Sequence, residues 1–168
     1  MMSTMILAIL ALAAPVAQQK LSNQAKVENL MVVQLWSDNS DEFLKAWAQP
    51  SPPNLKTTTK IERNKPITSF IIFAGCQGDA AGKCNLEGSV VFRDPDGQIY
   101  GEQNGLKFWD GAALDGFNLR LSPIGPSMVI EDGEKLGDYT VRMTITDRNS
   151  GVTAVTEEKL TVVEAGAK

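Results

Sequence analysis

The only two cysteines in the chain, Cys76 and Cys84, lie in the segment FAGCQGDAAGKCNLEG with seven residues between them. A structural zinc site needs four cysteine or histidine ligands, and a redox-active pair has the spacing C-x-x-C. The chain contains no histidine, so a cysteine nucleophile would lack its usual base. The pattern therefore predicts one disulfide that closes a short loop between two paired strands, as is typical of exported proteins.

A loop closed in this way loses less conformational entropy when it binds a partner than an open loop of the same length. The closed segment, QGDAAGK, is rich in glycine and alanine and carries three larger polar side chains. We therefore predict that Gln77, Asp79 and Lys83 contact a binding partner.

Carboxylates are the other residues that could do chemistry, since a pair of them can serve as acid and base in glycoside hydrolysis. Asp94 and Asp96 belong to an Asp-Pro-Asp-Gly sequence, whose composition is that of a type I turn followed by a bulge. Asp110 and Asp115 stand beside glycines, so loop geometry explains them equally well. The remaining acidic residues considered for such a pair are Glu87 and Glu102. We expect no catalytic pair and therefore no enzyme.

Calcium is the metal to consider, because DPDG begins like a calcium-binding loop. Its glycine stands at the fourth place instead of the sixth, and no glutamate follows at the twelfth. Calcium at Asp79, Asp94 or Asp96 stays as an alternative, and the expected complement is no metal and no cofactor.

Aromatic side chains could form a platform for a sugar ring or a peptide. We expect Trp36 and Trp47 to hold a short helix against a sheet. Phe108 and Trp109 lie in the glycine-containing segment 105–116, which we predict to be a loop. They are the best aromatic candidates for surface contact, and the alternative is that they plug one end of the fold.

The composition fits one domain with a substantial core. The chain has 168 residues, 43% of them hydrophobic, and a formal net charge of −4. Lysine and arginine do not gather into a stripe, so nucleic acid and anionic membranes are disfavoured as partners.

The N-terminal sequence MMSTMILAILALAAPVAQQ has the features of a signal peptide. An apolar run of about ten residues is too short to span a bilayer comfortably. The sequence Ala11-Leu12-Ala13 has the small-x-small form that a signal peptidase recognises, and Ala17 is an alternative end of the leader. We assign residues 1–17 to the leader and residues 18–168 to a single domain without a stable membrane anchor. This predicts a periplasmic or secreted protein.

Hydrophobic patterning along the mature chain predicts strands almost throughout. One helix is expected after Asn39, whose side chain can cap it while Glu42 completes a capping box. Residues 55–61 resemble an edge strand, with Lys56 and Lys60 guarding it against unwanted pairing. The other expected strands are 27–36, 67–75, 86–93, 98–101, 117–122, a short one in 127–137, 138–147 and 152–163. This predicts an all-β, immunoglobulin-like antiparallel β-sandwich with one short N-terminal helix.

The segment LGDYTVRMTITDRNSGVTAVTEEKLTVV resembles the last two strands of exported PKD-like and bacterial immunoglobulin-like domains. The resemblance rests on Gly137, Tyr139, Asp147 and Gly151 and covers about 30 residues. It implies that the hydroxyl of Tyr139 bonds back to the backbone as a tyrosine corner. A shared fold transfers no function.

Together these patterns predict an exported, non-catalytic domain that binds a protein or takes part in assembly of the bacterial envelope. The expected contact residues are Gln77, Asp79, Lys83, Phe108 and Trp109. The alternative is a carbohydrate-binding module or a sugar-acting accessory protein, which would use exposed aromatics to hold a glycan.

Overall fold

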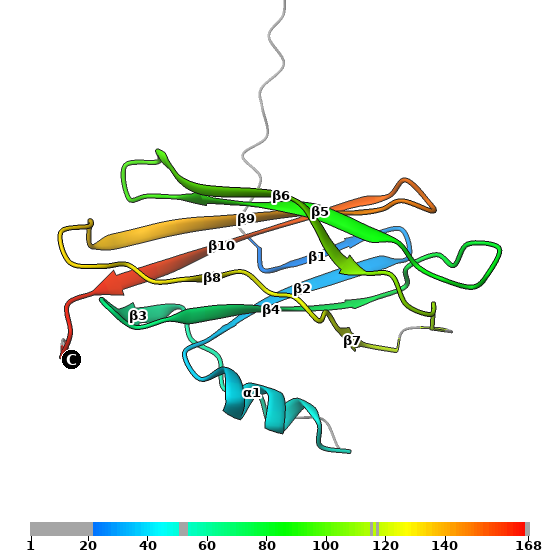
Figure 1. Ribbon diagram of the computed structural model, residues 1–168, viewed down its shortest axis with the longest axis horizontal. Coiled ribbons are helices and arrows are strands. Elements are labelled where there is room, and N and C mark those ends of the chain that lie inside the picture. The colour runs from blue at the N-terminus through cyan, green and yellow to red at the C-terminus, as the bar shows by residue number, and fades with distance from the viewer. Residues whose placement is uncertain (1–21, 51–53, 115, 117, 167–168) are drawn as a thin grey trace, which may run out of the picture.

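The computed structural model describes residues 22–50, 54–114, 116 and 118–166, which form two facing β-sheets with one helix outside them (Figure 1). The predicted leader lies outside the described residues. The first sheet contains β1 (Gln24–Val27), β2 (Leu30–Ser37), β4 (Ile67–Ala74), β7 (Arg120–Leu121) and β8 (Ser127–Met128). The second contains β3 (Lys60–Glu62), β10 (Thr153–Val163), β9 (Gly137–Asp147), β5 (Leu86–Arg93) and β6 (Ile99–Trp109) in that spatial order. The prediction of an all-β sandwich with one short helix is confirmed.

Alternating side chains on β9 form the centre of the core. Tyr139, Val141, Met143 and Ile145 are all buried between the sheets, whereas Arg142 between them is exposed. This is the alternation that the sequence predicts. The hydroxyl of Tyr139 donates a hydrogen bond of 2.9 Å to the carbonyl of Lys135, which confirms the expected bond back to the backbone.

The strand predicted over residues 27–36 is confirmed from Leu30 onward as β2, but its first residues belong to β1 and to the turn between the two strands. β1 and β2 pair antiparallel, with Val27 opposite Leu30, so that only two residues form the turn. Glu28 has a φ of 52°, the left-handed conformation that such tight turns require. The sequence lacks the usual Asn-Gly or Asp-Gly signal at this point, and the turn was therefore missed.

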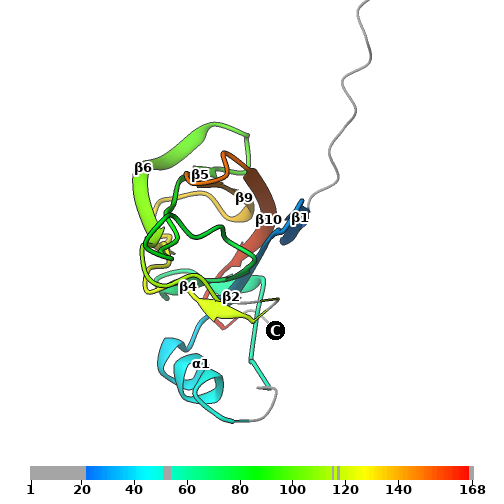
Figure 2. The same cartoon turned by 90° about the vertical axis from the view of Figure 1, so that its right-hand side faces the viewer.

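The helix α1 (Ser40–Trp47) begins as predicted. The side chain of Asn39 accepts a hydrogen bond of 3.1 Å from the backbone N–H of Glu42. The helix lies against the outer face of the first sheet (Figures 1 and 2). Phe43 stacks on Phe70 of β4, with ring centroids 3.8 Å apart and an angle of 7° between the rings.

The expected anchoring of the helix by Trp36 is wrong. Trp36 points into the core between the sheets, because β2 alternates and its inward positions are even-numbered. Trp47 is half-buried on the helix itself. The stack of Phe43 on Phe70 is a contact between helix and sheet that the sequence did not indicate.

The strand β3 lies at the edge of its sheet, but it covers only the last two residues of the edge strand predicted at 55–61, and the threonines before it are not in a strand. It pairs parallel with β10. The wholly antiparallel arrangement predicted for the sandwich is thus corrected at this one pair. Lys56 forms an ion pair of 2.6 Å with Glu42, so its partner is the helix. The Asp-Pro-Asp-Gly turn is confirmed, since Gly97 donates a 2.8 Å hydrogen bond to the Asp94 carbonyl and has a φ of 79°.

The long strand β6 corrects the prediction of a loop over residues 105–116. It continues to Trp109, and its pairing with β5 is irregular at three places. The strand predicted at residues 117–122 is reduced to the two residues of β7, and Phe117 lies outside the described residues. No helical segment within the described residues reaches the length and hydropathy that crossing a membrane requires.

Candidate functional site

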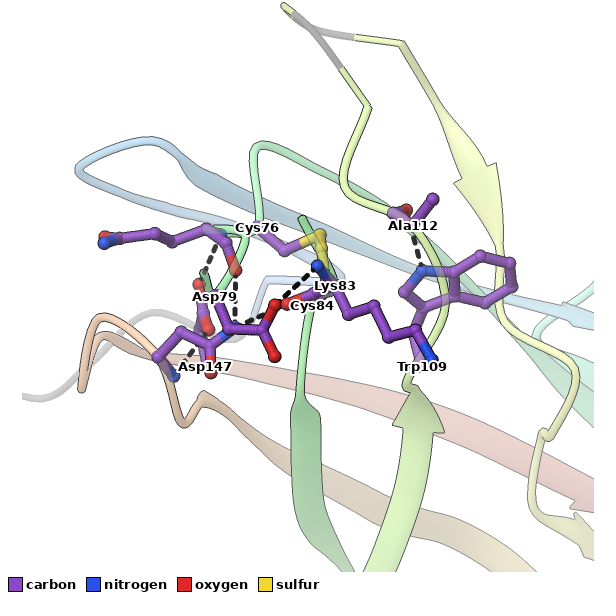
Figure 3. Close-up of a disulfide and its surroundings, with 9 residues drawn as sticks. Cys76, Asp79, Lys83, Cys84, Trp109, Ala112 and Asp147 are labelled. Atoms are coloured by element: carbon purple, nitrogen blue, oxygen red, sulfur yellow. Dashed lines mark hydrogen bonds between the residues drawn. A yellow bond between two sulfur atoms is a disulfide. The ribbon is translucent and has the colours of Figure 1, made fainter. Parts of the chain in front are cut away.

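One end of the sandwich gathers four segments around the disulfide, and we call it the disulfide end. It consists of the β1–β2 turn, the loop of residues 75–85, the segment 110–114 and the β9–β10 turn. Figure 3 shows the disulfide with the hydrogen bonds around it. Three of the five predicted contact residues lie on the loop of residues 75–85.

The predicted disulfide between Cys76 and Cys84 is confirmed, with a Cα–Cα distance of 5.9 Å. Its structural context differs from the prediction, because β4 and β5 belong to different sheets and do not pair with each other. The loop is therefore a crossover from one sheet to the other instead of the end of a hairpin. The covalent bond holds together the two ends of this crossover.

The interior of the loop is organised by Asp79. Its Oδ1 atom accepts hydrogen bonds from the backbone N–H groups of Ala81, at 2.8 Å, and Lys83, at 2.9 Å. The Asp79 N–H in turn donates to the Lys83 carbonyl at 2.8 Å. The backbone N–H groups of Lys83 and Ala81 hold the pKa of Asp79 below its ordinary value. The carboxylate thus shapes the loop, and this bonding accounts for it without a metal.

Asp147 at the end of β9 attaches the loop to the neighbouring turn. It is only 1% exposed, and its Oδ2 atom accepts a 2.7 Å hydrogen bond from the N–H of Gln77. Its Oδ1 atom accepts one of 3.0 Å from the N–H of Asn149. The Asn149 side-chain amide donates to the carbonyls of Gln77, at 2.7 Å, and Lys83, at 2.8 Å. The disulfide and these hydrogen bonds to the turn therefore both hold the loop in place.

This role of Asp147 and Asn149 was missed from the sequence. Asp147 was recognised there only as the start of a turn, and Asn149 was not singled out. The contacts join residues about 70 positions apart in the chain, with sequence separations of 70 and 72 for the bonds to Gln77. A polar residue in a turn carries no local signal of such a distant partner.

Trp109 forms part of the wall behind the loop. It is half-buried, and its Nε1–H donates a 3.2 Å hydrogen bond to the carbonyl of Ala112. The guanidinium of Arg120 lies 5.0 Å from the ring centroid, a cation–π geometry. A Cβ atom on Gly111 would come within 2.6 Å of the indole, so only glycine allows the chain to pass this closely. Trp109 thus supports the segment 110–114.

Phe108 is fully buried, with 0% of its surface exposed, and belongs to the core. The prediction that it contacts a partner is therefore wrong, and the alternative of plugging the fold is the correct one for this residue. The reason is strand alternation, since neighbours on β6 point to opposite faces. Gln77, Asp79 and Lys83 are exposed on the loop.

A cleft of about 550 Å³ opens between these segments. Its walls combine apolar side chains, including Leu30, Leu114 and Val152, with polar groups of the loop and the β9–β10 turn. Gly75 allows the loop to lie against the β1–β2 turn, because it has a φ of 74° and an added Cβ would lie 1.8 Å from the Asn29 carbonyl oxygen. A volume of this size is in the range that accommodates a small ligand or side chains of a partner.

Within the described part of the chain, no cluster of three or more histidine, cysteine, aspartate or glutamate residues could hold a metal ion. The groups that line the site include apolar side chains, backbone polar groups and the side chains of Glu28 and Asp147.

No family model matches the chain, and no curated protein matches it. Among solved structures, it is similar to a Niemann-Pick type C2 protein from Japanese carpenter ant, with 11% identity and a TM-score of 0.39. That alignment covers 84% of this chain and 95% of the ant protein. The chain is also similar to a family 123 glycoside hydrolase from Clostridium perfringens, with 11% identity and a TM-score of 0.41. That alignment covers 79% of this chain but only 27% of the hydrolase. The resemblance to PKD-like and bacterial immunoglobulin-like domains stays a prediction.

Proposed function

We propose that this protein is an exported, non-catalytic domain that binds a protein partner at its disulfide end and serves in assembly of the bacterial envelope. The observation that carries the proposal is the construction of the loop of residues 75–85. Its ends are joined by the disulfide, its interior is bonded through Asp79, and its flank is bonded to the β9–β10 turn. Gln77 and Lys83 project from this fixed backbone.

Such pre-organisation supports a binding role, because association costs less free energy when the contacting loop is already ordered. The adjacent cleft could receive one or two side chains of a partner, while the loop and the β1–β2 turn would supply the surrounding contact area. Stable protein interfaces bury roughly 800 Å² on each side, so we expect the loop surface to take part together with the cleft.

A protein partner is favoured over a glycan by the positions of the tryptophans, all three of which lie in the described part of the chain. Trp36 is buried, and Trp47 and Trp109 are half-buried. Arg120 also lies over the ring of Trp109. A flat, exposed indole on which a sugar could stack is thus not offered by any of them.

Site-specific photo-crosslinking in the native envelope tests the proposal. A photoreactive amino acid replaces Gln77 in one variant, Lys83 in a second and Gln103 in a third. Gln103 is the matched control, since it is exposed on β6, away from the disulfide end. We expect the variants at 77 and 83 to capture the same protein, and the variant at 103 to give no such product.

A charge reversal provides the second part of the test. Lys83→Glu should weaken capture by the photoreactive residue at 77 at least several-fold without changing the melting temperature, because the lysine side chain is exposed. Equal capture from position 103, or no defined product from 77 and 83, would contradict the proposal and favour a purely structural domain. A change in tryptophan fluorescence on titration with a glycan panel would favour the carbohydrate-binding alternative instead.

A further inference from the structure

The core of the sandwich contains a group of polar side chains far from the disulfide end. Gln34 and Trp36 lie on the inward face of β2, Ser69 on that of β4 and Glu158 on that of β10. Gln34 and Ser69 are 0% exposed and Trp36 is 1% exposed. Glu158 is half-buried and shares its face of β10 with the core residues Thr156 and Leu160.

Each of these side chains has a buried polar atom without a hydrogen-bond partner among the described residues. The atoms are Gln34 Nε2, Trp36 Nε1, Ser69 Oγ and Glu158 Oε2. Buried polar atoms in proteins are normally bonded to protein or to ordered water, so several unpartnered ones in one region need an explanation.

The strand pairing places these residues next to one another. Trp36 and Ser69 are directly opposite in the β2–β4 pair, and Gln34 lies two residues before Trp36 on the same face. Thr156 Oγ1 donates a 2.8 Å hydrogen bond to Gln34 Oε1, which joins the two sheets at this level. Glu158 follows Thr156 by two residues on the same face, a step of roughly 7 Å along the strand.

The segment between α1 and β3 confirms that β2 and β10 run side by side here. The N–H of Thr58 donates to the Trp36 carbonyl at 2.9 Å, and the N–H of Thr161 donates to the Thr59 carbonyl at 2.7 Å. Figure 2 also shows β1 beside β10, where the N–H of Glu157 donates to the Ser22 carbonyl at 2.9 Å. Gln34, Trp36 and Glu158 therefore face the same part of the interior.

The unpartnered atoms include both donors and acceptors that do not bond one another directly, and a molecule that both accepts and donates hydrogen bonds can bridge them. The indole and amide N–H groups can only donate, an ionised carboxylate can only accept, and the hydroxyl of Ser69 can do both. We propose that Gln34, Trp36, Ser69 and Glu158 form an internal site that binds water between the sheets, with Glu158 as its proton-exchanging group. A water molecule there would accept from Gln34 or Trp36 and donate to Glu158 or Ser69.

The environment of Glu158 acts on the pKa of its carboxyl through burial. Its cross-strand partner on β9, Val141, is fully buried. Burial raises the pKa of Glu158 to about 7. Protonated Glu158 can donate a hydrogen bond and ionised Glu158 cannot, so the bound water must reorient near this pH.

The titratable and charged groups described on the adjoining elements do not offset the effect of burial on the pKa of Glu158. On the inward face of β9, Tyr139 is bonded to the Lys135 carbonyl, and Asp147 lies six residues from Val141, roughly 20 Å away. The inward residues described on β2, β3, β4 and β5 include no charged group. On the outer face, Lys26 of β1 lines a groove with Arg142 and Glu157. Next to Glu158 on β10, Lys159 is paired with Asp138.

Nuclear magnetic resonance of the indole N–H of Trp36 tests the site directly. We expect its resonance to shift with pH with a midpoint near 7, and we expect magnetisation transfer from a long-lived water molecule to this proton. Glu158→Gln should abolish the pH-dependent shift. Glu157→Gln is the matched control, because Glu157 is the adjacent residue and pairs with Arg142 at 3.2 Å on the outer face. This control should retain the shift.

Ser69→Ala provides a second variant that keeps the carboxyl group. It removes one partner of the water, so the transfer of magnetisation to Trp36 should weaken while the titration persists. A titration of Trp36 that survives in Glu158→Gln would overturn the assignment of the proton to Glu158. Absence of water transfer to Trp36, together with a crystal structure in which the four side chains bond directly to one another, would overturn the water site.

Discussion

The raised pKa of Glu158 predicts that the protein loses stability as the pH rises from about 4.5 to about 7. Burial raises the pKa of this carboxyl from its ordinary value of 4.5 to about 7 in the folded protein. Between these two values the folded state binds more protons than the unfolded state, so the free energy of unfolding decreases with increasing pH. Above pH 7 the carboxyl is ionised in both states, and this contribution no longer changes.

The size of the effect follows from the gap between the two pKa values. A gap of about 2.5 corresponds to about 3.4 kcal/mol at full burial, at about 1.36 kcal/mol for each pKa unit. Glu158 is only half-buried, so solvent screening reduces this figure. We therefore expect a loss of about 1.5 kcal/mol between pH 5 and pH 8. Exposed carboxylates with lowered pKa values, such as Asp94 and Asp138, lose their contributions at more acidic pH, outside this window.

Urea unfolding of the mature protein at several pH values from 5 to 8 measures the loss. The wild type should show the decrease, Glu158→Gln should be nearly independent of pH across this interval, and Glu157→Gln should behave like the wild type. At pH 8 the Glu158→Gln variant should be more stable than the wild type, since it buries no charge. Wild-type stability that rises between pH 5 and 8, or the same decrease in Glu158→Gln, would refute the reasoning.

Three further predictions concern the disulfide end and the sheet pairing. Asp147→Ala should destabilise the protein by about 2–3 kcal/mol, because it leaves two backbone N–H groups without their acceptor. Hydrogen exchange should also accelerate at the backbone amide of Gln77, and unchanged exchange there would contradict the role of the carboxylate. Replacing both Cys76 and Cys84 by serine should lower the free energy of unfolding, measured in urea, by about 2.5 kcal/mol, which is the loop-closure value for this separation. A variant as stable as the wild type would show that the disulfide does not restrict the unfolded chain. In Gly88→Ala the added Cβ would lie 1.9 Å from the Thr144 carbonyl oxygen, so the strands must move apart there. We expect the melting temperature to fall by at least 5 °C, since a loss of roughly 1 kcal/mol lowers it by several degrees. Gly101→Ala, whose Cβ would meet only a side-chain atom at 3.7 Å, is the control, and similar losses for both glycines would contradict the clash.

Features that depend on near neighbours in the chain could be predicted from the sequence. The alternation of β9, the cap of α1 by Asn39 and the Asp-Pro-Asp-Gly turn each involve residues within a few positions of one another. The same is true of the Tyr139 hydroxyl, whose acceptor is four residues away. The period of hydrophobic residues and the side-chain chemistry of caps and turns encode such features directly.

The candidate site could be predicted only in part. The cysteine spacing correctly indicated a disulfide-closed loop, but it carried no information on whether the flanking strands pair. Phe108 and Trp109 are adjacent in the sequence, and only the register in which β6 pairs with β5 decides which of them faces the core. Asp147 illustrates the same limit, since its partner lies 70 residues earlier.

By itself, the sequence determined that the chain forms strands with a shared hydrophobic interior, where some of them turn, and that a single covalent bond closes one loop. The tertiary structure alone decided which strands share a sheet, that the closed loop crosses between sheets, and that Gln34 of one sheet bonds Thr156 of the other inside the core. The physical reason is that local hydrogen bonding and hydrophobic periodicity act over a few residues. The partners of a buried polar group are instead chosen by how distant strands pack.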